Sequence, residues 1–131
     1  KDNYGRTALI HTSIRGYLEV VKELIKAGAN IEAKDNYGWT ALIYASYNNR
    51  LEVVKELIKA GANLEAKDNF GETALIHASV YGFNNDHLEV VKYLELKHNE
   101  LNEIRELELI KYLYKKITKN IINYTNDYLK I

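Results

Sequence analysis

The chain has 131 residues, about the length of one domain, with 18 basic and 18 acidic residues and a net charge of zero. This balance provides no overall field that would attract phosphates or anionic lipids, so we expect neither nucleic acid nor a membrane as the partner. The absence of cysteine excludes disulfides and thiolate metal sites, and it favours an intracellular location. No apolar run reaches the ~18 residues that span a bilayer. Because methionine is absent even at position 1, we expect these residues to be part of a longer product.

Two sequence blocks recur along the chain. KDNYGRTALI begins at Lys1, and KDNYGWTALI and KDNFGETALI begin at Lys34 and Lys67, so successive copies start 33 residues apart. LEVVKELIKAGAN begins at Leu18 and again at Leu51, and the shortened form LEVVKYL begins later than this period predicts, after the insertion GFNNDH. We therefore divide the chain into repeats 1–33, 34–66 and 67–98, followed by a C-terminal segment 99–131.

Each repeat predicts a turn followed by two helices. The run Asp2–Gly5 is a turn signal, and Thr7, directly before an apolar stretch, is typical of a helix N-cap. Gly16 and its counterpart Asn49 tolerate positive φ, so we expect the first helix to end there and Asn49 to adopt positive φ. The block from Leu18 divides into an apolar and a charged face, which predicts an amphipathic second helix.

The third repeat differs from the others between its two helices. Gly82 matches Gly16, so we expect the first helix to end there as well. We expect GFNNDH, residues 82–87, to lengthen only the loop between the helices. Asp86 should cap the following helix, with Glu89 completing a capping box.

A 33-residue unit of turn, short helix, loop and helix resembles the ankyrin family in both residues and period. The features that match in register from Lys1 to about Leu96 are D-x-x-G-x-T-A-L, L-E-V-V-K and G-A-N. The family's Thr-Pro-Leu-His is here Thr-Ala-Leu-Ile, so we expect apolar packing from Ile10, Ile43 and Ile76 in place of the family's Thr-to-His hydrogen bond. The resemblance implies an all-α ankyrin-repeat solenoid of helix-turn-helix units, joined by β-hairpin-like turns, with C-terminal capping helices.

Some positions vary between the repeats while their neighbours stay the same, which makes them candidates for contact with a partner. They lie in the turns and on one side of the first helix, where residues three and four apart share a face. The resemblance implies that these positions line a concave groove that binds another protein. The candidate partner-binding residues are Tyr4, Arg6, His11, Ile14, Arg15, Tyr37, Trp39, Tyr44, Tyr47, Asn48, Phe70, Glu72, His77, Val80 and Tyr81.

Trp39 is the preferred binding residue, because Trp and Tyr are enriched in binding hot spots. Its position holds Arg6 and Glu72 in the other repeats, and burying an unpaired charge would cost several kcal/mol, so we expect Trp39 to be exposed. Trp39→Ala should then change stability by no more than about 0.5 kcal/mol. It should weaken partner binding by ~2 kcal/mol or more. For Tyr4, Tyr37 and Phe70, packing between adjacent turns is an equal alternative.

The sequence predicts no catalytic, cofactor or metal site. His11 and His77 are two repeats apart and should lie ~20 Å from each other, too far to share a metal, so we expect the histidines at the surface. Ser79 and His77 lie on different sides of a helix, which excludes them as a nucleophile and base pair. There is no phosphate-binding G-x-x-x-x-G-K or G-x-G-x-x-G motif. We therefore expect a non-catalytic scaffold for protein binding.

Two alternatives stay open for the C-terminal segment. Asn99 could cap a helix there, since acidic residues come early and basic residues late. A continuous helix would form a coiled coil and make the chain a homodimer through 107–131, a structural self-assembly module. A broken helix would fold onto the last repeat and leave a monomer, which we favour because tyrosine and asparagine suit a two-stranded seam poorly. The apolar residues spaced by seven are Leu107, Tyr114, Ile121 and Tyr128, and Ile110, Ile117, Tyr124 and Ile131.

Overall fold

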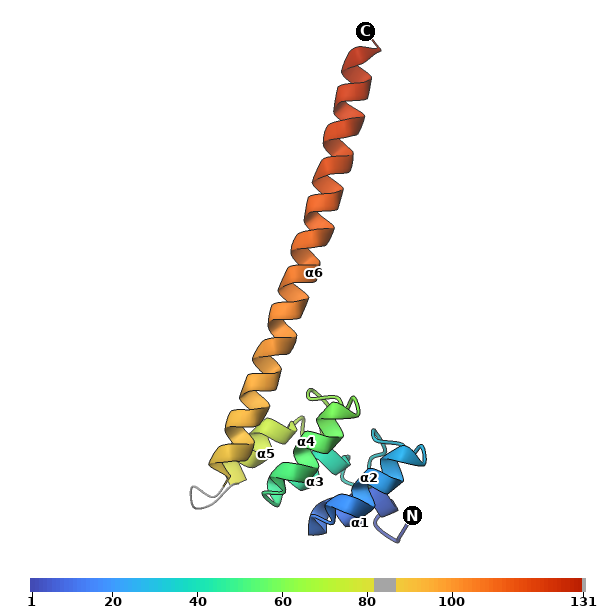
Figure 1. Ribbon diagram of the computed structural model, residues 1–131, viewed down its shortest axis with the longest axis vertical. Coiled ribbons are helices and arrows are strands. Elements are labelled where there is room, and N and C mark those ends of the chain that lie inside the picture. Colours follow the sequence, from blue (N-terminus) through green and yellow to red (C-terminus); the bar gives the residue numbers. More distant parts are fainter. Residues whose placement is uncertain (82–86, 131) are drawn as a thin grey trace. The chain divides into compact units, whose positions relative to one another are not determined.

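The computed structural model describes residues 1–81 and 87–130, and these form six helices and no strand (Figure 1). The chain divides into two compact units, Lys1–Leu96 and Lys97–Ile131, which are described separately. Among the described residues, no helix has the length and apolar character needed to cross a membrane. The helices are α1 (Ala8–Arg15), α2 (Leu18–Lys26), α3 (Ala41–Tyr47), α4 (Leu51–Lys59), α5 (Ala74–Tyr81) and α6 (Leu88–Leu129).

The predicted starts and ends of the first helices are confirmed in repeats one and two. The hydroxyl oxygens of Thr7 and Thr40 accept hydrogen bonds from backbone amides three residues later, at 3.2 and 3.3 Å, and so cap α1 and α3. Gly16 ends α1 with φ 74°, and Asn49 has φ 56° just after α3. The expectations for Gly82, Asp86 and the rest of GFNNDH up to residue 86 lie outside the described residues, as does Ile131.

Hydrogen bonds join the turns of successive repeats side by side. The Asn36 amide donates to the Tyr4 carbonyl at 2.9 Å, and the Asn69 amide donates to the Tyr37 carbonyl at 3.1 Å. Each contact needs a glycine, because a Cβ on Gly38 would lie 2.5 Å from Asn69 Oδ1, and Gly38 also has a positive φ of 79°. The turns therefore stack in register, and they hold the first helices of the three repeats in a row.

The core of the first unit lies between the inner helices α1, α3 and α5 and the outer helices α2 and α4, together with the start of α6. Ser13 and Ser46 are fully buried, and small residues at these positions let the inner helices approach closely. Ile10 and Ile43 are buried as expected from the Thr-Ala-Leu-Ile motif, whereas Ile76, in the last repeat, is half-buried. The stacked inner helices present one common face together with the turns.

The expected break after the third repeat is not found. Helix α6 runs without interruption from Leu88 to Leu129, so Asn99 lies inside a helix and caps nothing. The glycine that ends α4 at Gly61 is replaced by His98, and no glycine or proline occurs between Leu88 and Leu129, so nothing stops the helix. From Glu103 to Lys130 every side chain is exposed, including the described residues of the apolar heptad stripe.

Candidate functional site

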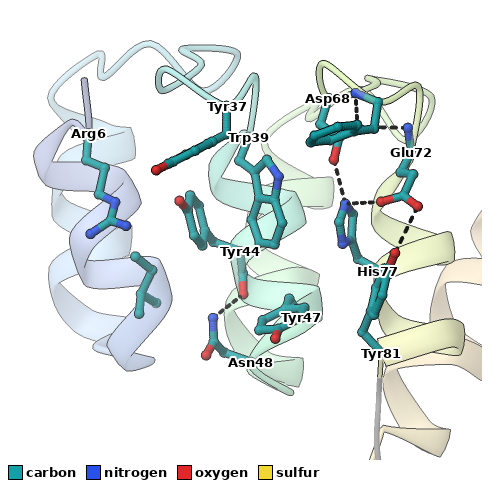
Figure 2. Close-up of a pocket in the computed structure, with 12 residues that line it drawn as sticks. Arg6, Tyr37, Trp39, Tyr44, Tyr47, Asn48, Asp68, Glu72, His77 and Tyr81 are labelled. Carbon is teal, nitrogen blue, oxygen red and sulfur yellow. Dashed lines mark hydrogen bonds and ion pairs between the residues drawn. The ribbon is translucent and has the colours of Figure 1, made fainter. Parts of the chain in front are cut away.

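A pocket of about 750 Å³ opens on the face formed by the turns and the inner helices (Figure 2). All but four of the predicted partner-binding residues line it. The four that do not are Tyr4, His11, Arg15 and Val80, and one lining residue, Asp68, was not predicted. The lining residues are Arg6, Ile14, Tyr37, Trp39, Tyr44, Tyr47, Asn48, Asp68, Phe70, Glu72, His77 and Tyr81.

Packed aromatic rings form part of the pocket wall. The ring centroid of Trp39 lies 4.7 Å from that of Tyr44, 5.4 Å from that of Tyr47 and 4.3 Å from that of His77. The Tyr81 ring lies 5.4 Å from that of His77 and so extends the cluster. Each such pair contributes about 0.5–1.5 kcal/mol beyond the burial of its area. These rings therefore hold each other in place in addition to lining a surface.

The expected exposure of Trp39 is wrong, because the side chain is half-buried and packs against the core. Arg6 and Glu72, at the same position, are half-buried too, but their charges have partners. The Arg6 guanidinium lies 4.8 Å from the centre of the Tyr4 ring, and Glu72 accepts a hydrogen bond from the Tyr81 hydroxyl at 3.0 Å. A position that accepts charged residues can therefore still be partly buried.

Tyr44 is also more buried than a partner-binding residue should be, with 8% of its surface exposed. Its hydroxyl donates a hydrogen bond to Asp35 Oδ2 at 2.5 Å. Burial, together with this hydrogen bond to a carboxylate, raises the pKa of Tyr44 to about 12. Tyr44 thus belongs mainly to the scaffold, although its ring lines the pocket.

The same contact links the turn to the inner helix in every repeat, between an aspartate and the ring nine residues later. Asp2 Oδ2 lies 2.8 Å from His11 Nε2, and the equivalent pair of Asp68 and His77 has the same distance. In the second repeat the pair is Asp35 and Tyr44. His77 is only 2% exposed, so the prediction that it is a surface histidine is wrong, whereas the His11 side chain is 35% exposed and lies at the surface as expected.

Asp68 is absent from the predicted binding residues because the pattern around its repeated position indicates only a turn. Its Oδ1 accepts hydrogen bonds from the backbone amides of Phe70 and Glu72, both at 2.9 Å, which leaves Oδ2 for His77. Burial alone would raise the pKa of Asp68, but the hydrogen bonds from Glu72, His77 and Phe70 outweigh it and lower this pKa. The recurrence of His, Tyr and His nine residues after each aspartate was the signal that could have identified the pair.

The pocket has a basic and an acidic end, as the sticks in Figure 2 show. Arg6, at the end near α1, also lies over the Tyr44 ring, 5.6 Å from its centre. At the end near α5, Glu72 Oε2 lies 3.5 Å from His77 Nε2. Around the opening, aromatic side chains are accessible, and the Phe70 ring is 82% exposed. The pocket therefore combines an aromatic surface with opposite charges at its two ends.

Comparison with protein families supports the interpretation of the repeats. A family model described as ankyrin repeats (3 copies) matches residues 1–68 and 34–105, which is most of the chain. A search of curated proteins found no relative that matches.

The packing of Trp39 predicts that its replacement destabilises the fold. Trp39→Ala removes three ring contacts and part of the core surface, so we expect the free energy of unfolding to fall by about 2 kcal/mol. Denaturant unfolding followed by circular dichroism measures this. Tyr37→Ala, in the same turn but about half exposed, is the matched control and should change stability by less than about 0.5 kcal/mol. If Trp39→Ala lowered the free energy of unfolding no more than Tyr37→Ala does, the Trp39 side chain would not contribute to the packing of the core.

The raised pKa of Tyr44 predicts a loss of stability at high pH. Because the folded state favours the protonated hydroxyl, its contribution is complete below pH 10, the unfolded pKa, and is lost as the pH rises to about 12. Absorbance of tyrosinate during alkaline titration should contain one component near 12, and Tyr44→Phe should remove it. Tyr17→Phe, at an exposed site outside the pocket, should leave that component in place. If the component persisted in Tyr44→Phe, another tyrosine would carry it, and the raised pKa would not belong to Tyr44.

Proposed function

Because the chain belongs to the ankyrin-repeat family, whose repeats generally mediate protein–protein interactions, we propose that it is a non-catalytic scaffold that binds a protein partner in the aromatic pocket. The single observation that carries this proposal is the aromatic lining of the pocket, with accessible rings at its opening. Exposed apolar patches on soluble proteins commonly mark interaction sites, and aromatic residues are enriched among the residues that dominate binding.

The packing of the pocket supports a preformed binding surface. Trp39 and His77 are held by ring contacts and by the turn hydrogen bonds, so little side-chain freedom is lost when a partner binds. The Phe70 ring at the opening is exposed, so it can contact a partner without any change in the packing of the core. The buried rings thus provide the shape of the site, and the exposed rings provide its contact area.

The charges at the two ends support one orientation of the partner. Arg6 favours an acidic group at the α1 end, and Glu72 favours a basic group at the α5 end. Such pairs at the rim of an interface act on specificity and association rate more than on affinity. Arg15, which was also expected to orient the partner, does not line the pocket and is not part of this proposal.

The family also supports a non-catalytic function. Ankyrin-repeat proteins are typically non-enzymatic. The acidic end of the pocket is therefore interpreted as part of a binding site.

Phe70→Ala tests the proposed pocket directly. Since the ring is 82% exposed, its removal should change stability by less than about 0.5 kcal/mol, while binding to a partner purified from the native source should weaken by about 1 kcal/mol or more. Calorimetric titration measures the affinity. The control is Tyr17→Ala, which removes a 55% exposed ring that does not line the pocket. If Phe70→Ala bound as tightly as the unmodified chain, the partner would bind elsewhere.

A second candidate function is self-association through residues 107–131, and the uninterrupted helix α6 favours it. Its apolar side chains alternate at spacings of three and four residues, the pattern of a coiled-coil seam. Ile110, Ile117 and Ile121 of this stripe are all exposed, which leaves an apolar surface in water unless a partner covers it. A two-fold interface pairs the same surface of both subunits, so a second copy of this chain could cover the stripe with its own stripe.

Ile117→Asp tests self-association, because it places a charge in the centre of the stripe. We expect the unmodified chain to sediment as a dimer and Ile117→Asp to shift it to a monomer, since a buried unpaired charge costs several kcal/mol. Tyr112→Asp places the same residue at an equally exposed position of the helix that lies outside the stripe, so this variant should stay dimeric. Sedimentation of the unmodified chain as a monomer at all concentrations would rule out this function.

A further inference from the structure

Three side chains that commonly bind metals come together at the acidic end of the pocket. Asp68, Glu72 and His77 each offer one ligand atom, and these atoms all lie within 4.8 Å of one another. His77 Nε2 lies 2.8 Å from Asp68 Oδ2 and 3.5 Å from Glu72 Oε2 (Figure 2). Ligand atoms that share one zinc ion at its usual bond lengths are about 3.0–3.4 Å apart. Small side-chain movements would therefore bring all three atoms to the distances that one ion requires.

Two of the three ligands are already fixed. The two turn amides that donate to Asp68 Oδ1 orient the carboxylate, so that its other oxygen faces the imidazole. The His77 side chain is buried between this carboxylate and the Trp39 ring. The Glu72 side chain is more accessible and completes the set from the pocket side. An ion held here would therefore keep open positions that face the pocket.

Comparison of the repeats separates the structural part of this cluster from the part that could bind a metal. An aspartate and a ring nine residues later are paired in all three repeats, so this pair by itself serves the fold. The third ligand occurs only in repeat three, since the position of Glu72 holds Arg6 and Trp39 in the others. In the second repeat, the ring is moreover a tyrosine. Of the three repeats, only the third therefore combines two carboxylates with an imidazole.

We propose that Asp68, Glu72 and His77 bind one divalent transition-metal ion, with zinc as the best fit to two carboxylates and one imidazole. A metal ion binds the unprotonated Nε2 of a neutral imidazole, so in the metal-bound state His77 would carry its one proton on Nδ1. Because Nδ1 is buried without a hydrogen-bond partner, the second contact that usually strengthens a histidine ligand is missing, and the expected affinity is micromolar. The open positions are available to water or to a donor atom of a bound partner.

The test uses metal ions alone and does not depend on the partner. Zinc chloride titrated into the metal-free 131-residue chain should bind with one equivalent and raise the melting temperature. Cobalt(II) should bind at the same site and quench the fluorescence of Trp39, the single tryptophan, whose ring lies 4.3 Å from that of His77. Zinc should then displace cobalt and restore the fluorescence.

The repeats provide matched variants for this experiment. His77→Tyr copies Tyr44 of repeat two, where the hydroxyl bonds the turn aspartate, so it should fold, as circular dichroism can check, and it should lose metal affinity by about 100-fold. Glu72→Gln should lose about 10-fold or more. His11→Tyr makes the same exchange in repeat one and should bind zinc like the unmodified chain. The proposal is overturned if no stoichiometric binding occurs at micromolar zinc, or if folded His77→Tyr binds with unchanged affinity.

Discussion

The carboxylate at the start of each turn organises the repeat, because its two oxygens serve two different elements. One oxygen accepts hydrogen bonds from two backbone amides and holds the turn, and the other contacts a ring on the inner helix nine residues later. The turn and the helix are thereby joined into one unit. Since the turns of neighbouring repeats are also hydrogen-bonded side by side, the rings at positions 11, 44 and 77 follow one another along the same face. The aromatic row is therefore a direct result of the scaffold.

The residue four positions after each aspartate decides how this row differs along the pocket. Arg6 lies over the ring of Tyr44 in the next repeat, and Trp39 packs on its own Tyr44 and on His77 of the next repeat. Glu72, in the last repeat, contacts His77 and Tyr81 of its own repeat. One repeated backbone position thus produces a basic end, an aromatic centre and an acidic end. The chemistry of the pocket depends on the repeat order, because each of these side chains meets different neighbours.

The outer helices show how a single type of residue controls the length of an element. Gly28 and Gly61 follow the ends of α2 and α4 with positive φ, which other residues adopt at a cost. The third copy has His98 at that position and continues as α6 through residues with good helix propensity. The C-terminal unit is consequently a helix with exposed side chains from Glu103 onward, and its apolar stripe is accessible to a partner.

The sequence by itself determined the period, the paired helices, the threonine caps and the positive φ of Asn49, because these depend on residues within a few positions of each other. It also identified most of the pocket residues, since internal copies separate the shared scaffold from the positions that vary. Only the tertiary structure decided that Trp39 and His77 are partly or fully buried and that Asp68 lines the pocket. These properties depend on contacts between residues nine positions apart or in different repeats. Equivalent positions have different neighbours in such contacts, although the sequence around each position is nearly the same.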